Sequence, residues 1–116
     1  MDLDELTLGI GNELVEKGAT EVELLQVEQK SKLAKRLIVC TVQDNICAKK
    51  VALELKEMLK DTLQCFHTDG IFRGDWIVLD YDDIIVHIFT KETRQKFNID
   101  KLYKDTKNFV EIDNKN

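Results

Sequence analysis

Two largely apolar runs separated by a short polar turn constrain this sequence more than any other feature. The first run spans Trp76 to Asp80 and the second Ile84 to Phe89, with Tyr81, Asp82 and Asp83 between them. Short runs rich in β-branched and aromatic residues, joined by so few residues, predict two antiparallel strands of a β-hairpin. The fold must therefore include a sheet that contains this hairpin.

A two-residue turn at Asp82 and Asp83 fixes the register of the predicted hairpin, and side chains then alternate between its faces. One face is almost purely aliphatic and predicts the core side: Ile77, Leu79, Tyr81, Ile84, Val86 and Ile88. The other mixes polar and apolar groups and is a candidate recognition face: Trp76, Val78, Asp80, Ile85, His87 and Phe89. In a purely structural alternative, Trp76 covers the core beneath a helix and His87 bonds to Asp80 or to a backbone carbonyl.

Hydrophobic periodicity predicts the other elements. Apolar residues three or four apart indicate an amphipathic helix from Leu3 to about Lys17, with Gly18 as its stop. The strongest helix pattern begins at Asp44 or Asn45 and places Cys47, Val51 and Leu55 on one face. Short apolar runs predict strands, and a polar stretch capped by Thr90 predicts a last short helix: strands 22–27, 37–42 and 63–67, helix 91–97.

This order of elements predicts an α/β fold with a mixed sheet of about five strands covered by helices, in the order α-β-β-α-β-β-β-α. One core suffices for 116 residues, so we expect a single domain at 1–104 and a polar C-terminal tail at 105–116. No apolar run approaches the roughly 20 residues that span a bilayer, and the acidic start does not suit a secretory signal. We therefore expect a cytoplasmic protein without a membrane partner.

The charge distribution bears on the kind of partner. The net charge is −5, and residues 69–90 hold five acids against the single base Arg73. Nucleic-acid binding gains affinity by neutralising phosphates, so a basic protein surface is the better electrostatic match. An RNA-binding alternative rests on four basic residues with no aromatic among them to stack a base: Lys30, Lys32, Lys35 and Arg36.

The cysteines indicate neither a metal site nor a disulfide framework. Cys40, Cys47 and Cys65 form no CxxC pair, and no histidine lies at the close spacing of a zinc site. Cys47 and His67 could be considered as a catalytic pair, but no neighbouring sequence activates either residue. We expect no cofactor and no metal.

The hairpin segment resembles the signature of the ribosomal silencing factor (Iojap-like) family, whose pattern combines a tryptophan, an Asp-Tyr-Gly-Asp turn and a Val-His-Phe-like strand. Eleven positions match in order and spacing: Gly74, Trp76, Leu79, Asp80, Tyr81, Asp83, Val86, His87, Phe89, Arg94 and Leu102. Phe97 and Tyr103 stand where the family prefers tyrosine and tryptophan. Asp82 replaces the turn glycine, and the first half departs further, at 35–37 and 41–42.

The resemblance implies a function without catalysis. Members of that family bind a basic ribosomal protein on the intersubunit face of the large ribosomal subunit and block joining of the small subunit. They often form homodimers, and a minor contact with ribosomal RNA is also conceivable here. On this reading the partner-binding residues are Trp76, Asp80, Tyr81, Asp82, Asp83, His87, Phe89 and Arg94.

An enzymatic alternative comes from the same resemblance, because the family's sheet has a nucleotidyltransferase-like topology. Such enzymes hold catalytic metals with an Asp-x-Asp pair and a third carboxylate. Asp80 and Asp82 meet the short pattern, but Thr41-Val42-Gln43-Asp44 stands where a nucleotide-binding Gly-Ser motif should precede them. Without phosphate donors at a helix start, a metal-dependent transferase site lacks its substrate cradle.

Overall fold

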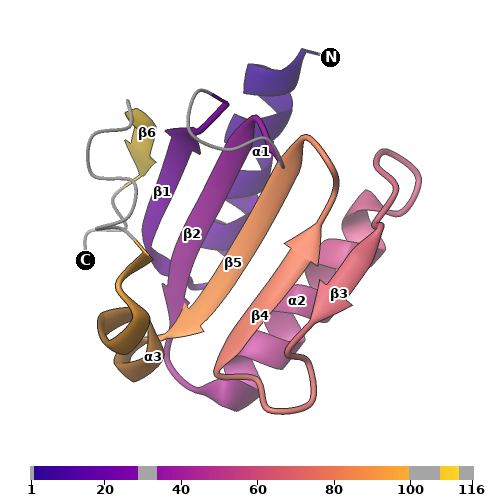
Figure 1. The fold of residues 1–116 in the computed structure, drawn as a ribbon. Helices are drawn as coiled ribbons and strands as arrows, with labels where there is room; N and C mark the ends of the chain where they lie inside the picture. Colours follow the sequence, from indigo (N-terminus) through magenta and orange to yellow (C-terminus); the bar gives the residue numbers. More distant parts are fainter. Residues whose placement is uncertain (1, 29–33, 100–107, 113–116) are drawn as a thin grey trace.

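The computed structural model describes residues 2–28, 34–99 and, for the backbone alone, 108–112. This part of the chain forms helices and strands in the order α1-β1-β2-α2-β3-β4-β5-α3-β6 (Figure 1). Their bounds are α1 Leu3–Glu16, β1 Thr20–Gln26, β2 Arg36–Val42, α2 Asn45–Leu59, β3 His67–Asp69, β4 Trp76–Asp80, β5 Ile84–Thr90, α3 Lys91–Phe97 and β6 Asn108–Ile112.

The strands form one six-stranded mixed sheet in the order β3-β4-β5-β2-β1-β6. β2 and β5 pair in parallel, and each of the other neighbouring pairs is antiparallel. The parallel pair lies at the centre of the sheet. β2 is buried on both faces, whereas β5 is buried on the core face and half-buried at Ile85 and His87 on the other. The predicted mixed α/β fold is confirmed.

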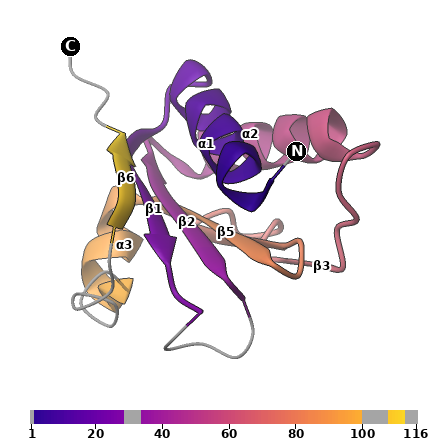
Figure 2. The ribbon, with the colours of Figure 1, turned by 90° about the horizontal axis from the view of Figure 1, so that it is seen from above.

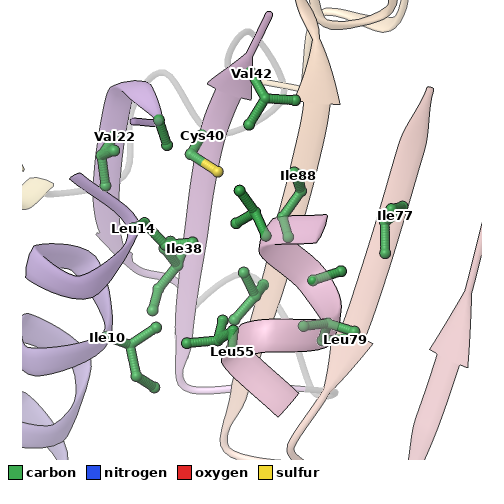
Figure 3. Close-up of a cluster of buried hydrophobic side chains, with 14 of the residues drawn as sticks. Ile10, Leu14, Val22, Ile38, Cys40, Val42, Leu55, Ile77, Leu79 and Ile88 are labelled. Atoms are coloured by element: carbon green, nitrogen blue, oxygen red, sulfur yellow. The ribbon is translucent and has the colours of Figure 1, made fainter. Parts of the chain in front are cut away.

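Helices α1 and α2 lie together on one face of the sheet, and α3 lies on the opposite side near the ends of β2 and β5 (Figure 2). The core fills the space between the sheet and the first two helices (Figure 3). Ile10 and Leu14 reach it from α1, and Leu55 reaches it from α2. Both helices begin as predicted, because Asp2 and Asp44 each accept a backbone N–H of the first turn.

Most boundaries agree with the sequence-based prediction to within two residues, and two differences are larger. The third strand is His67–Asp69 rather than 63–67, because the N–H of Leu63 bonds to the carbonyl of Leu59 in a turn that continues from α2. Leu63 still packs against the core, which explains its apolar character. A sixth strand, β6, lies within the segment that we expected to be a polar tail and pairs with β1.

Some predictions concern residues outside the described part of the chain. These are Lys30 and Lys32 of the RNA-binding alternative, and Leu102 and Tyr103 of the family signature. Among the residues that the structure describes, no helix has the length and apolar character needed to cross a membrane.

Candidate protein-binding surface

The hairpin has the register that its sequence predicts. Trp76 pairs with Phe89, Val78 with His87 and Asp80 with Ile85. The turn is closed by the N–H of Tyr81, which donates to the carbonyl of Ile84, and by the N–H of Asp82, which donates to the Asp80 carboxylate. Asp82 adopts a φ of 73°, the left-handed conformation for which the family's glycine is suited.

The mixed face of the hairpin points away from α1 and α2. The aliphatic face enters the main core, whereas Trp76, Ile85 and Phe89 belong to a second, smaller cluster. α1 and α2 cover the other side of the sheet (Figure 2), and among the described residues α3 is the helix that approaches this face. We call it the open face and define it by its half-buried members: Trp76, Val78, Asp80, Ile85 and His87.

Trp76 is held in place by a hydrogen bond and by ring contacts. Its Nε1–H donates to Nδ1 of His87 over 2.9 Å, and its ring stacks on Phe89 with centroids 4.9 Å apart. Phe97 from α3 contacts the same ring at 4.9 Å between centroids. Aromatic pairs of this kind contribute about 0.5–1.5 kcal/mol each beyond area burial. The indole is therefore fixed in orientation while part of it faces solvent.

His87 takes part in this arrangement as a neutral base. Accepting a hydrogen bond at Nδ1 requires a ring whose proton is on Nε2. Burial lowers the pKa of His87 to about 4, because water no longer solvates the charged form. The Nδ1 atom of His87 thus bonds to Trp76, not to Asp80 or a backbone carbonyl as the structural alternative supposed. Both side chains pack against their neighbours and remain partly exposed.

Three of the eight predicted partner-binding residues are buried and are not part of the open face. Phe89 is fully buried beneath Trp76, and Tyr81, at 4% exposure, lies on the core side. Arg94 is also buried, and its guanidinium donates to the Glu21 carbonyl at 2.6 Å and to Thr41 Oγ1 at 2.9 Å. Phe89 and Arg94 support the open face from within, and Tyr81 lies beside the hairpin turn on the core side. The exposed or half-buried residues of the eight are Trp76, Asp80, Asp82, Asp83 and His87.

Acidic side chains border the open face. Asp69 is exposed on the neighbouring strand β3, where its register places it opposite Val78. Asp82 and Asp83 are exposed in the hairpin turn, and Asp80 is half-buried between them and the strand. Asp69 was counted in the acidic stretch and Phe97 in the family signature, but neither was among the predicted partner-binding residues, because the pairing of β3 and the approach of α3 do not follow from local patterns.

The catalytic alternative finds little support in the geometry. Asp80 and Asp82 are joined in a local turn, where the Asp80 carboxylate accepts the Asp82 N–H at 2.8 Å. Within the described residues, no group of three or more His, Cys, Asp or Glu side chains could hold a metal ion. The pair therefore lacks the third carboxylate that the metal-dependent chemistry needs.

Comparison with known proteins bears directly on the family. The sequence model of the family "Ribosomal silencing factor during starvation" matches residues 3–116. The chain belongs to this family. Ribosomal silencing factor RsfS of Bacillus subtilis (strain 168) is 26% identical over 91 residues, which are 78% of this chain and 77% of the relative. RsfS of Haemophilus influenzae is 29% identical over 85 residues, 72% of this chain and 83% of the relative.

Solved structures support the fold of this RsfS-family member. A crystal structure from Chromobacterium violaceum superposes with a TM-score of 0.85 at 23% identity, covering 90% of this chain and 88% of that one. A structure from Bacillus halodurans gives a TM-score of 0.75 at 25% identity, covering 84% and 92%. The sequence resemblance noted at the hairpin is thus confirmed as family membership, including the divergent first half.

Proposed function

We propose that this RsfS-family chain binds the large ribosomal subunit through a basic protein on its intersubunit face and so blocks joining of the small subunit. Its action is steric, with no bond made or broken, and it represses translation in the cytoplasm. The observation that carries the proposal is the half-buried, oriented indole of Trp76 on the open face. Large, fixed aromatic rings of this kind are the usual anchors of protein interfaces.

The electrostatic character of the surface supports a basic partner. Asp69, Asp82 and Asp83 are exposed around the open face, and the chain as a whole carries a net charge of −5. Complementary charges at the rim of an interface raise the association rate and select the partner, while the buried centre supplies affinity. The central contacts would come from Trp76 and its apolar neighbours Val78 and Ile85.

RNA is a weaker candidate for the main contact. Arg36 is 8% exposed, and its guanidinium donates to the carboxylates of Asp4, at 2.9 Å, and Glu28. Two carboxylates around one guanidinium leave no positive charge there for a phosphate. Lys35 remains exposed and would allow at most a minor contact with ribosomal RNA beside the protein interface. A homodimer remains part of the proposal as a state that would compete for the same sheet.

The test is co-sedimentation of the purified chain with large ribosomal subunits through sucrose. We expect Trp76→Glu to abolish co-sedimentation, because it removes the anchor and places a charge in the apolar centre of the interface, where its burial is costly. Leu53→Glu is the matched control: Leu53 is 55% exposed on α2, on the other side of the sheet, so this variant should bind as the original chain does.

Circular dichroism separates loss of binding from loss of folding. Trp76 contacts Phe89, Phe97 and His87, so a folded Trp76→Glu chain is required for the comparison. If that variant unfolds, Trp76→Phe retains a ring for packing and should weaken binding at least about tenfold, as loss of a major interface anchor does. Undiminished co-sedimentation of either folded variant would refute the proposed surface.

A further inference from the structure

A hollow of about 380 Å³ lies at one end of the sheet, away from the open face's centre. It is enclosed by the first turns of α1, the connection between α2 and β3, and the β4–β5 turn, which meet at the same end of the molecule (Figures 1 and 2). Half of its lining residues are apolar, namely Leu3, Leu6, Leu63, Phe66 and Ile84. Phe66 is 59% exposed, which is unusual for so large an apolar side chain.

The Tyr81 hydroxyl has no hydrogen-bond partner within the described part of the chain, although its side chain is 4% exposed. Burial raises the pKa of Tyr81 to about 12, and the neighbouring Cys65 thiol adds to the shift. The hydrogen bonds of that thiol run to the His67 carbonyl and to Thr68 Oγ1. The phenol is thus neutral, and the Cys65 thiol is its polar neighbour.

Tyr81 lines this hollow and also an adjoining one of about 430 Å³. Buried polar atoms are nearly always hydrogen-bonded, so an unpartnered hydroxyl in a residue that lines a cavity can bond to a group that enters the cavity. The sequence pattern alone had assigned Tyr81 to the core side of the hairpin. The structure adds that Tyr81 belongs to the core and also lines both hollows, with its hydroxyl buried and without a partner among the described residues.

The charge of the hollow identifies the chemistry of that partner. Asp82 and Asp83 belong to the lining and are exposed, and the lining contains no lysine, arginine or histidine. Neither carboxylate forms an ion pair with a described residue. A group that enters needs an apolar stem to cover the leucines, a positive charge for the carboxylates and N–H donors for the Tyr81 oxygen.

We propose that this hollow binds an arginine side chain presented by a segment of the protein partner. The aliphatic stem packs against Leu3, Leu6 and Ile84, and the guanidinium donates to the Tyr81 hydroxyl and to a carboxylate of the turn. Arginine suits both contacts because its five N–H donors spread over a rigid plane, whereas lysine offers a single point of charge. The inference rests on the proposed function for the identity of the partner, a basic ribosomal protein.

Binding of arginine itself is testable with the full chain by NMR. The ¹⁵N-labelled protein is titrated with Nα-acetyl-arginine N-methylamide and, separately, with the citrulline analogue, which has the same shape and no charge. We expect saturable shifts of the amide signals of Leu6, Leu63 and Asp83 with the arginine compound, and binding at least about fivefold weaker with citrulline. Equal shifts with both compounds, or none with arginine, would overturn the proposal.

Tyr81→Phe removes the hydroxyl and keeps the buried ring. We expect arginine binding to weaken about fivefold, the effect of losing one hydrogen bond, with no decrease in the melting temperature. The second readout is specific, because deleting an unpartnered polar atom does not destabilise the free protein. A clear drop in melting temperature would mean that the hydroxyl already has a partner in the free chain, and the proposal would fail.

The carboxylates are tested by the double variant Asp82→Asn, Asp83→Asn, which should bind arginine at least about threefold more weakly. The control Glu16→Gln, Glu92→Gln changes the net charge equally at two exposed sites outside the hollow, and should bind as the original chain does. Equal loss in both double variants would assign the attraction to net charge alone. Spermidine shifting the same signals as strongly as arginine would exclude specific recognition of a side chain.

The two proposals fail in different ways. The Trp76→Glu variant should no longer co-sediment with large ribosomal subunits, and it should still bind the arginine compound in the NMR titration. Co-sedimentation that is unchanged by Tyr81→Phe and by the double asparagine variant would refute the hollow as a subsite while leaving the open face intact. Arginine binding without any co-sedimentation of the original chain would refute the proposed function alone.

Discussion

Acid should destabilise this protein through His87, because the fold holds its imidazole neutral. The pKa of His87 is lowered from 6.5 to about 4 by burial. Below about pH 6.5 the unfolded chain therefore takes up a proton that the folded chain does not bind until about pH 4, so stability falls with pH across that window. At pH 4.5 the loss relative to pH 7 is about 2 kcal/mol, from 1.36 kcal/mol for each pH unit of difference.

Urea denaturation at pH 7 and at pH 4.5 measures this loss, with His87→Gln as the control. Glutamine does not titrate, and its side-chain oxygen can still accept the Nε1–H of Trp76. Carboxylates elsewhere in the chain titrate equally in both proteins, so the difference between the two pH dependences isolates His87. We expect the original chain to lose about 2 kcal/mol more than the variant. Identical pH dependences would refute the account of a neutral, buried imidazole.

Two further predictions concern residues that support the surface. Asp82→Gly should cost at least about 1 kcal/mol less stability than Asp83→Gly in urea denaturation, because Asp82 has a positive φ that suits glycine and Asp83 does not; equal costs would contradict the strain. Arg94→Met should destabilise by about 3 kcal/mol, since it leaves the Glu21 carbonyl and the Thr41 hydroxyl without their buried donor. A melting temperature within 2–3 °C of the original, the range of a change below about 1 kcal/mol, would show that these contacts contribute little.

The hairpin could be predicted to single-residue accuracy, and there is a physical reason. A slip of one residue in the pairing would have moved Ile77 and Leu79 to the other face. The short turn left one register that kept all the aliphatic side chains together. The amphipathic helices were predictable for a similar reason, because α1 and α2 each have a single apolar side and an aspartate cap.

The burial of side chains on the side of the sheet with the open face could not be predicted in the same way. Alternation places Phe89 beside Trp76, but burial of Phe89 depends on a second cluster that includes Leu25, Leu37 and Val39 from distant strands. Arg94 was selected for its place in a family signature, and its buried partners lie 73 and 53 residues away in sequence. Such long-range packing leaves no local pattern. The sequence alone therefore does not distinguish a signature residue that is exposed at the surface from one that is buried beneath it.

The hydrogen bond between Trp76 and His87 determines how the open face can recognise a partner. It occupies the only polar atom of the indole, so a partner meets an apolar ring of fixed orientation. A basic protein can use that ring through apolar contact and through a lysine or arginine placed over its face, which contributes about 0.5–2 kcal/mol. The acidic border acts at longer range and is screened by salt. Under the proposed function, substitutions at Asp69 or Asp83 should therefore change mainly the salt-dependent association rate, and substitutions at Trp76 the dissociation rate.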